Sequence, residues 1–155
     1  MLENMWILVA NSAKARVYLA HKAKLLIASA SERDLILLKE YEHPESQKHD
    51  SELVSDHSGR YRSTANGSNT FDAPTDPKKY EENRFAQTLC KMLQSACHDK
   101  EFQELILVAS PVFMGMLNKH ISHDDNLQRL ITTKIEKDYL KLNDRDLVIH
   151  LRKQL

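Results

Sequence analysis

The chain has 155 residues, and its 22 lysines and arginines are balanced by 22 aspartates and glutamates. This length suits one domain with one hydrophobic core, so we expect residues 1–155 to form a single domain. A neutral chain lacks the basic excess that is typical of proteins held to DNA by charge, and DNA binding is therefore not expected.

The N-terminal segment carries no pattern for export. Its apolar run extends only from Met5 to Ala10 without a preceding basic region, whereas a signal peptide needs about 7–15 apolar residues after positive charge. No apolar stretch approaches the roughly 20 residues of a membrane-spanning helix. The two cysteines, Cys90 and Cys97, are too far apart along a helix for a disulfide and are expected to be reduced. We therefore expect a cytosolic protein without a membrane partner.

The first part of the chain predicts three strands. Met5–Ala10 is an apolar run rich in β-formers, and residues 15–20 follow it closely enough to form an antiparallel hairpin. Residues 22–31 fit either an extension of the sheet or a short helix. The third strand is expected over residues 34–41, before His43 and Pro44, because the residue before a proline disfavours helix.

Residues 45–75 differ in composition from the rest of the chain. Serine, asparagine, aspartate, histidine and glycine make up much of this segment, and apolar residues are isolated. Loops longer than about 12–15 residues are uncommon in compact domains and are usually functional or disordered. The sequence therefore predicts that this long polar loop carries the functional surface.

Regular structure is expected again from Asp76, which can cap a helix that begins at Pro77. The apolar stripe of this helix faces the core and consists of Phe85, Leu89, Leu93 and Ala96. A strand, a short helix, a strand and a last helix follow, over residues 104–109, 111–119 and 130–135 and from Asn143 onward. Between them, His120, His123, Asp124 and Asp125 are expected in a solvated loop.

Three antiparallel strands followed by alternating helices and strands predict an α/β fold. The expected architecture is a mixed five-stranded sheet of ribonuclease-H-like order with helices on its faces. Two-metal nuclease chemistry needs carboxylates on the central strands, but the first strand has none and the fourth has only Glu104. The chain also lacks the nucleophile elbow of hydrolases and the glycine-rich loops that bind phosphates.

The pentapeptide from Asp56 to Arg60 is the strongest local pattern in the long loop. Asp56 and His57 are candidate catalytic residues for proton transfer, while Ser58, Gly59 and Arg60 are candidate binding residues. The alternative is a polar surface turn without a specific role. The histidine spacing in the loop fits no zinc pattern, so neither a metal nor another cofactor is expected.

Basic residues lie in the second half of the long loop and just after it. Arg60 and Arg62 lie within it, and Lys78, Lys79 and Arg84 follow it on the predicted helix. Together they could line one positive edge suited to RNA phosphate. A solvated helix start explains the lysines equally well. Ser110 likewise leaves two interpretations open, a helix cap or part of an anion site.

Several blocks of the sequence, in order, resemble the bacterial host attachment protein family. The resemblance spans nearly the whole chain, and its blocks are Trp6 to Asn11, Ala15 to Tyr18, His43-Pro44, Ser55 to Arg60, Phe85-Ala86, Leu107 to Pro111, Phe113 to Gly115 and Asp138. Members of that family are similar in fold to the middle domain of archaeo-eukaryotic peptide-release factors. Those domains carry Gly-Gly-Gln in a loop, and this chain has no such tripeptide.

The resemblance implies a factor that acts on the translation machinery, with the ribosome or RNA as its partner. In this hypothesis Ser58, Gly59, Arg60, Arg62 and Lys79 make the contact. One alternative is a hydrolase that cleaves an ester of RNA or a nucleotide through Asp56 and His57. Another is a protein-interaction or adhesion-linked factor, as the family name suggests. The oligomeric state stays open.

Overall fold

The structure, a computed structural model, describes residues 3–43 and 76–155. Its centre is a five-stranded sheet with the order β3-β2-β1-β4-β5. β1 pairs antiparallel with β2 and parallel with β4. The strands are β1 (Met5–Ala10), β2 (Lys14–Ala20), β3 (Ile36–Glu42), β4 (Glu104–Ala109) and β5 (Ile131–Ile135). The predicted α/β class, with a mixed sheet of ribonuclease-H-like order, is confirmed.

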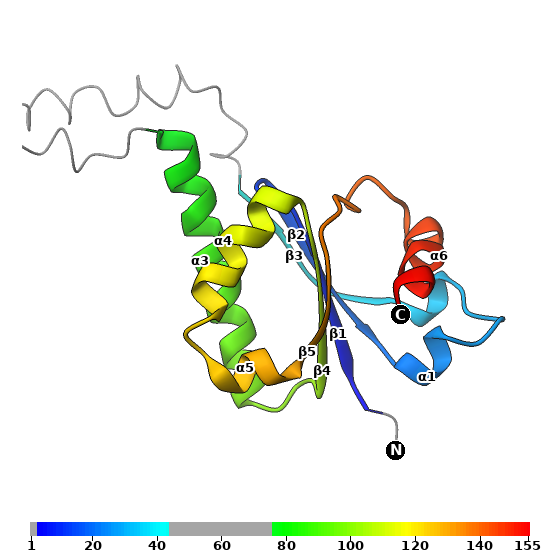
Figure 1. Cartoon of the computed structure of the whole chain (residues 1–155). Coiled ribbons are helices and arrows are strands. Elements are labelled where there is room, and N and C mark those ends of the chain that lie inside the picture. The colour runs from blue at the N-terminus through cyan, green and yellow to red at the C-terminus, as the bar shows by residue number, and fades with distance from the viewer. Residues whose placement is uncertain (1–2, 44–75) are drawn as a thin grey trace, which may run out of the picture.

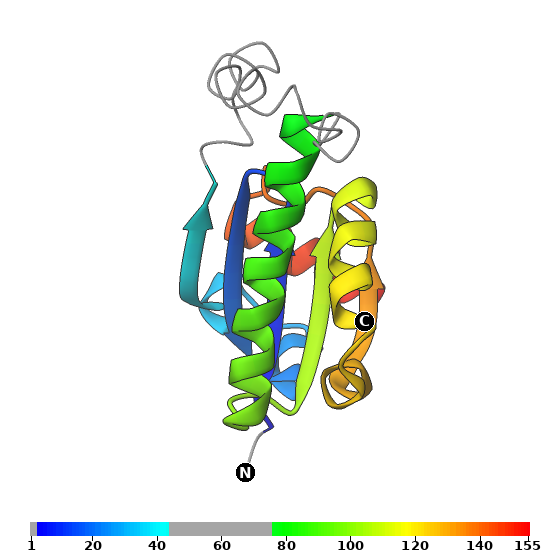
Figure 2. The same cartoon turned by 90° about the vertical axis from the view of Figure 1, so that its left-hand side faces the viewer.

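Helices cover both faces of this sheet (Figure 1). One face carries α3 (Pro77–His98), α4 (Pro111–Ile121) and α5 (Asp125–Leu130), and the other carries α1 (Lys22–Leu25) and α6 (Asp144–Gln154). α3 runs along the sheet with α4 beside it (Figure 2). Within the described ranges, no helix is long and apolar enough to cross a membrane.

β1 is buried on both faces because a hydrophobic core lies on each side of it. Trp6, Leu8 and Ala10 belong to the core beneath α3, α4 and α5. The alternate residues Met5, Ile7 and Val9 belong to the core beneath α6. Successive side chains of a strand point to opposite faces, so an unbroken apolar run at this position serves two cores at once.

One predicted boundary, the start of the third strand, was wrong for a local reason. The third strand was expected from residue 34, but the side chain of Asp34 accepts a hydrogen bond from the Ser31 backbone N–H and completes a capping box. This 3-10 helix, η1 (Glu32–Asp34), delays the start of β3 to Ile36. The alternatives left open for residues 22–31 resolve as the short helix α1.

The loop expected around residues 120–125 also proved wrong in part. Asp124 accepts a hydrogen bond from the Leu127 backbone N–H at 3.0 Å and thereby caps α5. Leu127 is fully buried in the core beneath α3. A single buried leucine gives too little periodicity to predict so short a helix from sequence.

Gly115 lies in α4 at a position where a side chain would fit. It is exposed, its φ is not positive, and an added Cβ would meet nothing within 4 Å. Glycine in a helix costs about 0.5–1 kcal/mol relative to alanine, because its backbone loses more freedom on folding. We therefore expect Gly115→Ala to raise the free energy of unfolding by about that amount in urea denaturation. A lower stability would contradict this account of α4.

Candidate functional site

Most of the predicted site residues lie outside the described residues. These are Asp56, His57, Ser58, Gly59, Arg60 and Arg62. Their roles, and the hydrolase hypothesis that depends on Asp56 and His57, therefore remain predictions. Lys79 is described, and it lies exposed in the first turn of α3.

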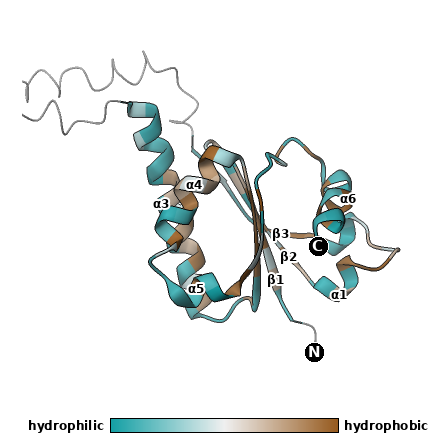
Figure 3. Ribbon diagram, viewed as in Figure 1, coloured by the Kyte–Doolittle hydropathy of each residue, from teal (hydrophilic) through white to brown (hydrophobic). Residues whose placement is uncertain are grey.

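The end of β3 and the start of α3 lie at the same end of the sheet (Figures 1 and 2). Residues 44–75 connect these two elements in the sequence. We use the name loop base for the described residues that gather at this point, namely His43, Lys79, Tyr80, Glu81 and Arg84. Figure 3 shows that the first turns of α3 are largely hydrophilic.

Local sequence fixes the start of α3. The Asp76 side chain accepts hydrogen bonds from the backbone N–H groups of Lys78 at 3.0 Å and Lys79 at 3.2 Å. Pro77 occupies the first turn, where its missing N–H is not needed. The predicted cap is confirmed, and it places Lys79 in the first turn of the helix.

The charges in this first turn run against the helix dipole. α3 has Lys78 and Lys79 there and no acidic residue, whereas α5 and α6 begin with Asp125 and Asp144. The amino end of a helix carries partial positive charge, so a cation there typically costs about 0.3–1 kcal/mol. The Asp76 carboxylate at the cap offsets part of this repulsion, and a bound anion would offset more of it.

Tyr80 and Arg84 lie one helical turn apart on α3. The Tyr80 side chain is 48% exposed, and the Arg84 guanidinium carbon lies 6.0 Å from the centre of the tyrosine ring. Arg84 is also exposed, and its Nη1 lies 3.5 Å from Glu81 Oε1. The loop base therefore presents to solvent an aromatic ring with a guanidinium over one of its faces.

Glu81 is the one buried charged residue in the described part of the chain, with 4% exposure. Its carboxylate lies between His43, with Nε2 at 3.3 Å from Oε2, and Arg84. The His43 ring stacks on Phe85 at 5.0 Å, and its backbone N–H donates to the Ala13 carbonyl at 2.7 Å. Glu81 thus lies where the end of β3 meets α3, in contact with both His43 and Arg84.

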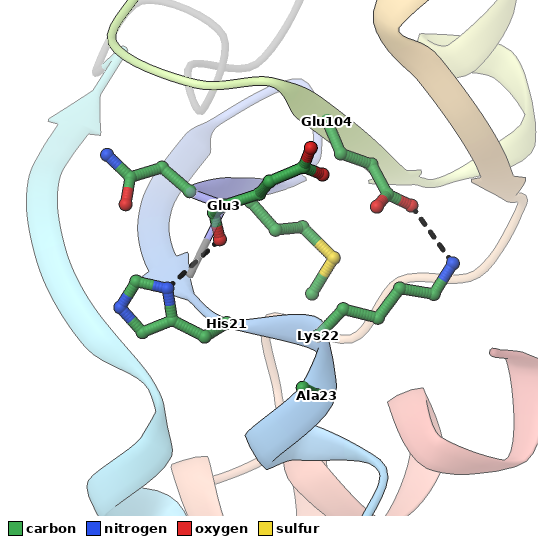
Figure 4. Close-up of a pocket in the computed structure, with 7 residues that line it drawn as sticks. Glu3, His21, Lys22, Ala23 and Glu104 are labelled. Atoms are coloured by element: carbon green, nitrogen blue, oxygen red, sulfur yellow. Dashed lines mark hydrogen bonds and ion pairs between the residues drawn. The ribbon is translucent and has the colours of Figure 1, made fainter. Parts of the chain in front are cut away.

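The opposite end of the sheet holds a pocket of about 220 Å³ (Figure 4). Two of its charged groups are paired with each other, because Lys22 Nζ lies 3.2 Å from Glu104 Oε2, and the same oxygen accepts a hydrogen bond from Thr132. His21 Nδ1 is 3.0 Å from the Glu3 carbonyl oxygen. Because Lys22, Glu104 and His21 already have partners, this pocket is a weaker candidate for a binding site than the loop base.

The described side chains form no recognisable nucleophile with an activating base. Burial raises the pKa of the Cys90 and Cys97 thiols, so both are poorer nucleophiles than a free cysteine. Ser110 makes no side-chain cap bond at the start of α4. Among residues 3–43 and 76–155, no three histidine, cysteine or acidic side chains are placed to hold a metal ion.

Lys79 and Arg84 were predicted to belong to one basic edge, whereas Tyr80, Glu81 and His43 were not predicted to join them in one cluster. The spacing of Tyr80 and Arg84, one turn apart on a predicted helix, was a signal that could have paired them. The contact between His43 and Glu81 had no such signal, because it depends on where β3 ends relative to α3.

Fold and site together define an α/β protein with a mixed, ribonuclease-H-like sheet and a basic, aromatic surface at the start of α3. Residues 6–151 match the model of the family described as "Protein required for attachment to host cells". The chain belongs to this host attachment family, as its sequence blocks predicted.

One solved structure similar to this chain is that of S. cerevisiae Dom34, described as a translation termination-like factor involved in RNA quality control pathways and interacting with Hbs1. The two are 12% identical with a TM-score of 0.44, and the alignment covers 97% of this chain but 35% of Dom34. No curated protein gives a significant match.

Proposed function

We propose that this chain is a translation-associated factor that binds RNA, on the ribosome or free, through the loop base and residues 45–75. It acts as one domain in the cytosol. The observation that carries the proposal is the pair of lysines, Lys78 and Lys79, that follows the Asp76 cap in the first turn of α3. Phosphates are the anions that such a surface suits, because backbone dipole and side-chain charge attract them together.

The sequence of the long loop supports the same assignment. Arg60 and Arg62 belong to the segment that leads directly into α3. In this proposal they extend the basic surface, while Ser58 and Gly59 let the backbone approach the RNA closely. Asp56 and His57 have no required role in binding, so their substitution separates this function from hydrolysis.

The test is pelleting of the protein with purified ribosomes at low salt. Lys79→Glu should weaken binding by about tenfold, because it removes a phosphate contact and adds repulsion. Lys91→Glu is the matched control, since Lys91 is an exposed lysine further along the same helix. We expect Lys91→Glu to bind like wild type.

Equal binding by wild type and both variants would contradict a contact at the start of α3. Equal weakening by both variants would point to nonspecific attraction along the whole helix and would equally count against the loop base. Far-ultraviolet circular dichroism checks that both variants keep the fold, which is expected because both lysines are exposed.

A further inference from the structure

We infer that Tyr80 is a stacking platform for one unpaired RNA base, with Arg84 and Lys79 contacting the neighbouring phosphates. This inference rests on the proposed function and makes it more specific. It names the ligand as single-stranded RNA, or an unpaired nucleotide of a folded RNA, and excludes a continuous duplex.

The exposure of Tyr80 is unusual within this structure. Of the described aromatic side chains, Tyr80 alone is exposed. The others are buried in the two cores or half-buried against them, as Tyr41 is. An aromatic side chain that is half exposed to solvent stabilises the fold less than a buried one does. A binding role therefore explains the position of Tyr80 better than packing does.

The chemistry around Tyr80 matches a nucleotide. Base–aromatic stacking uses the π-face that every base has, and exposed aromatic rings beside cations are the usual platform for single strands. Arg84 lies over one face of the ring at 6.0 Å, the outer limit of cation–π distance, so a base would stack on the other face. Its guanidinium is therefore near enough to contact a phosphate beside a base stacked on Tyr80.

Glu81 holds this arrangement in place. Its buried carboxylate lies 3.5 Å from Arg84 Nη1 and 3.3 Å from His43 Nε2. A guanidinium held from one side loses less freedom on binding than a fully mobile one. Lys79 adds a second cation next to Tyr80 in the sequence, at the positive end of the helix.

A duplex does not fit this surface equally well. Bases in an A-form helix are already stacked on one another, and only unstacked bases in loops, bulges and ends can contact an aromatic side chain. Cations alone would bind any polyanion, whereas an exposed ring adds preference for unpaired bases. Preference for single strands is therefore the property that distinguishes stacking from simple charge attraction.

The experiment is fluorescence anisotropy with the full chain and a labelled single-stranded RNA of about ten nucleotides, within the range such sites span. The same strand annealed to its complement is the duplex probe. Tyr80→Ala should weaken single-strand binding about tenfold, and Tyr80→Phe should retain it because phenylalanine also stacks. Lys91→Ala is the control variant on the same helix.

Salt dependence separates the two kinds of contact. For single strands, each phosphate contact contributes about 0.7 to the slope of log affinity against log salt. Tyr80→Ala should leave this slope unchanged, whereas Arg84→Ala should reduce it by about that amount. If Tyr80 had only a structural role, Tyr80→Ala would not lower the affinity while leaving the salt slope unchanged.

Wild-type affinity in Tyr80→Ala, with loss in Arg84→Ala, would overturn stacking and leave the proposed RNA binding intact. Absence of RNA binding by wild type, with ribosome pelleting retained, would overturn the inference while the ribosomal assignment stands. Absence of both would overturn the inference and the proposed function together. Equal affinity for duplex and single strand would also contradict the inference.

Discussion

Replacing Phe85 by alanine should lower the free energy of unfolding by about 3–5 kcal/mol, the range for a buried phenylalanine. Phe85 is 3% exposed in the core between the sheet and α3. Its ring lies 5.0 Å from His43 and 5.8 Å from Phe113. Truncation would leave a cavity where β3, α3 and α4 meet. Urea denaturation followed by circular dichroism measures the loss.

Two further variants give this prediction its controls. Phe85→Leu keeps most of the volume and should cost clearly less than Phe85→Ala. Thr88→Ala changes an exposed position on the same helix and should shift stability by no more than about 0.5 kcal/mol. If Phe85→Ala lost less than about 1 kcal/mol, the packing described between α3 and α4 would be wrong.

Tyr18→Phe should destabilise the protein by about 1.5–3 kcal/mol near neutral pH, the range for a hydrogen bond to a charged group. The Tyr18 side chain is 1% exposed, and its hydroxyl donates to Asp144 Oδ1 at 2.8 Å. This bond connects β2 to the first turn of α6. Phenylalanine keeps the ring in the core but removes the donor.

The same tyrosine should make stability fall in alkaline solution. Burial, followed by the hydrogen bond to Asp144, raises the pKa of Tyr18 to about 12. In the unfolded chain a tyrosine loses its proton near pH 10. Between those values the unfolded state binds fewer protons than the folded state, so stability decreases as pH rises. The contribution is complete below about pH 10 and lost by about pH 12, a decrease of about 2–3 kcal/mol.

Denaturation curves at pH values from about 8 to 11.5 test this linkage. Wild type should lose stability more steeply across that range than Tyr18→Phe, because the variant has no phenol at this position to titrate. Other tyrosines and the lysines titrate in both proteins and cancel in the comparison. Parallel declines in the two proteins would show that Tyr18 has no raised pKa in the folded state.

Much of the fold could be predicted because single residues mark its boundaries. Asp76 with Pro77 defines the start of α3, and the apolar run Met5–Ala10 predicts a strand buried on both faces. The misplaced elements depended on contacts instead. Asp34 belongs to a capping box and not to β3, and α5 is stabilised mainly by its cap and by burial of Leu127.

The candidate site could be predicted only in part, for a similar reason. Lys79 and Arg84 are charged residues next to a polar segment, which composition alone reveals. The burial of Glu81 and its contact with His43 arise where β3 meets α3. The local sequence does not predict that the two elements pack together there. Tyr80 could be predicted in part, because its spacing to Arg84 is visible in the sequence but its exposure to solvent is not.

Sedimentation of cell lysate through sucrose gradients, at low and at high salt, tests the central claim most directly. The account predicts that the protein migrates with ribosomal particles at low salt and leaves them as salt rises, because phosphate contacts release counterions. Confinement to the top fractions under both conditions would contradict a ribosome-binding function and would favour an enzyme or a protein-partner role instead.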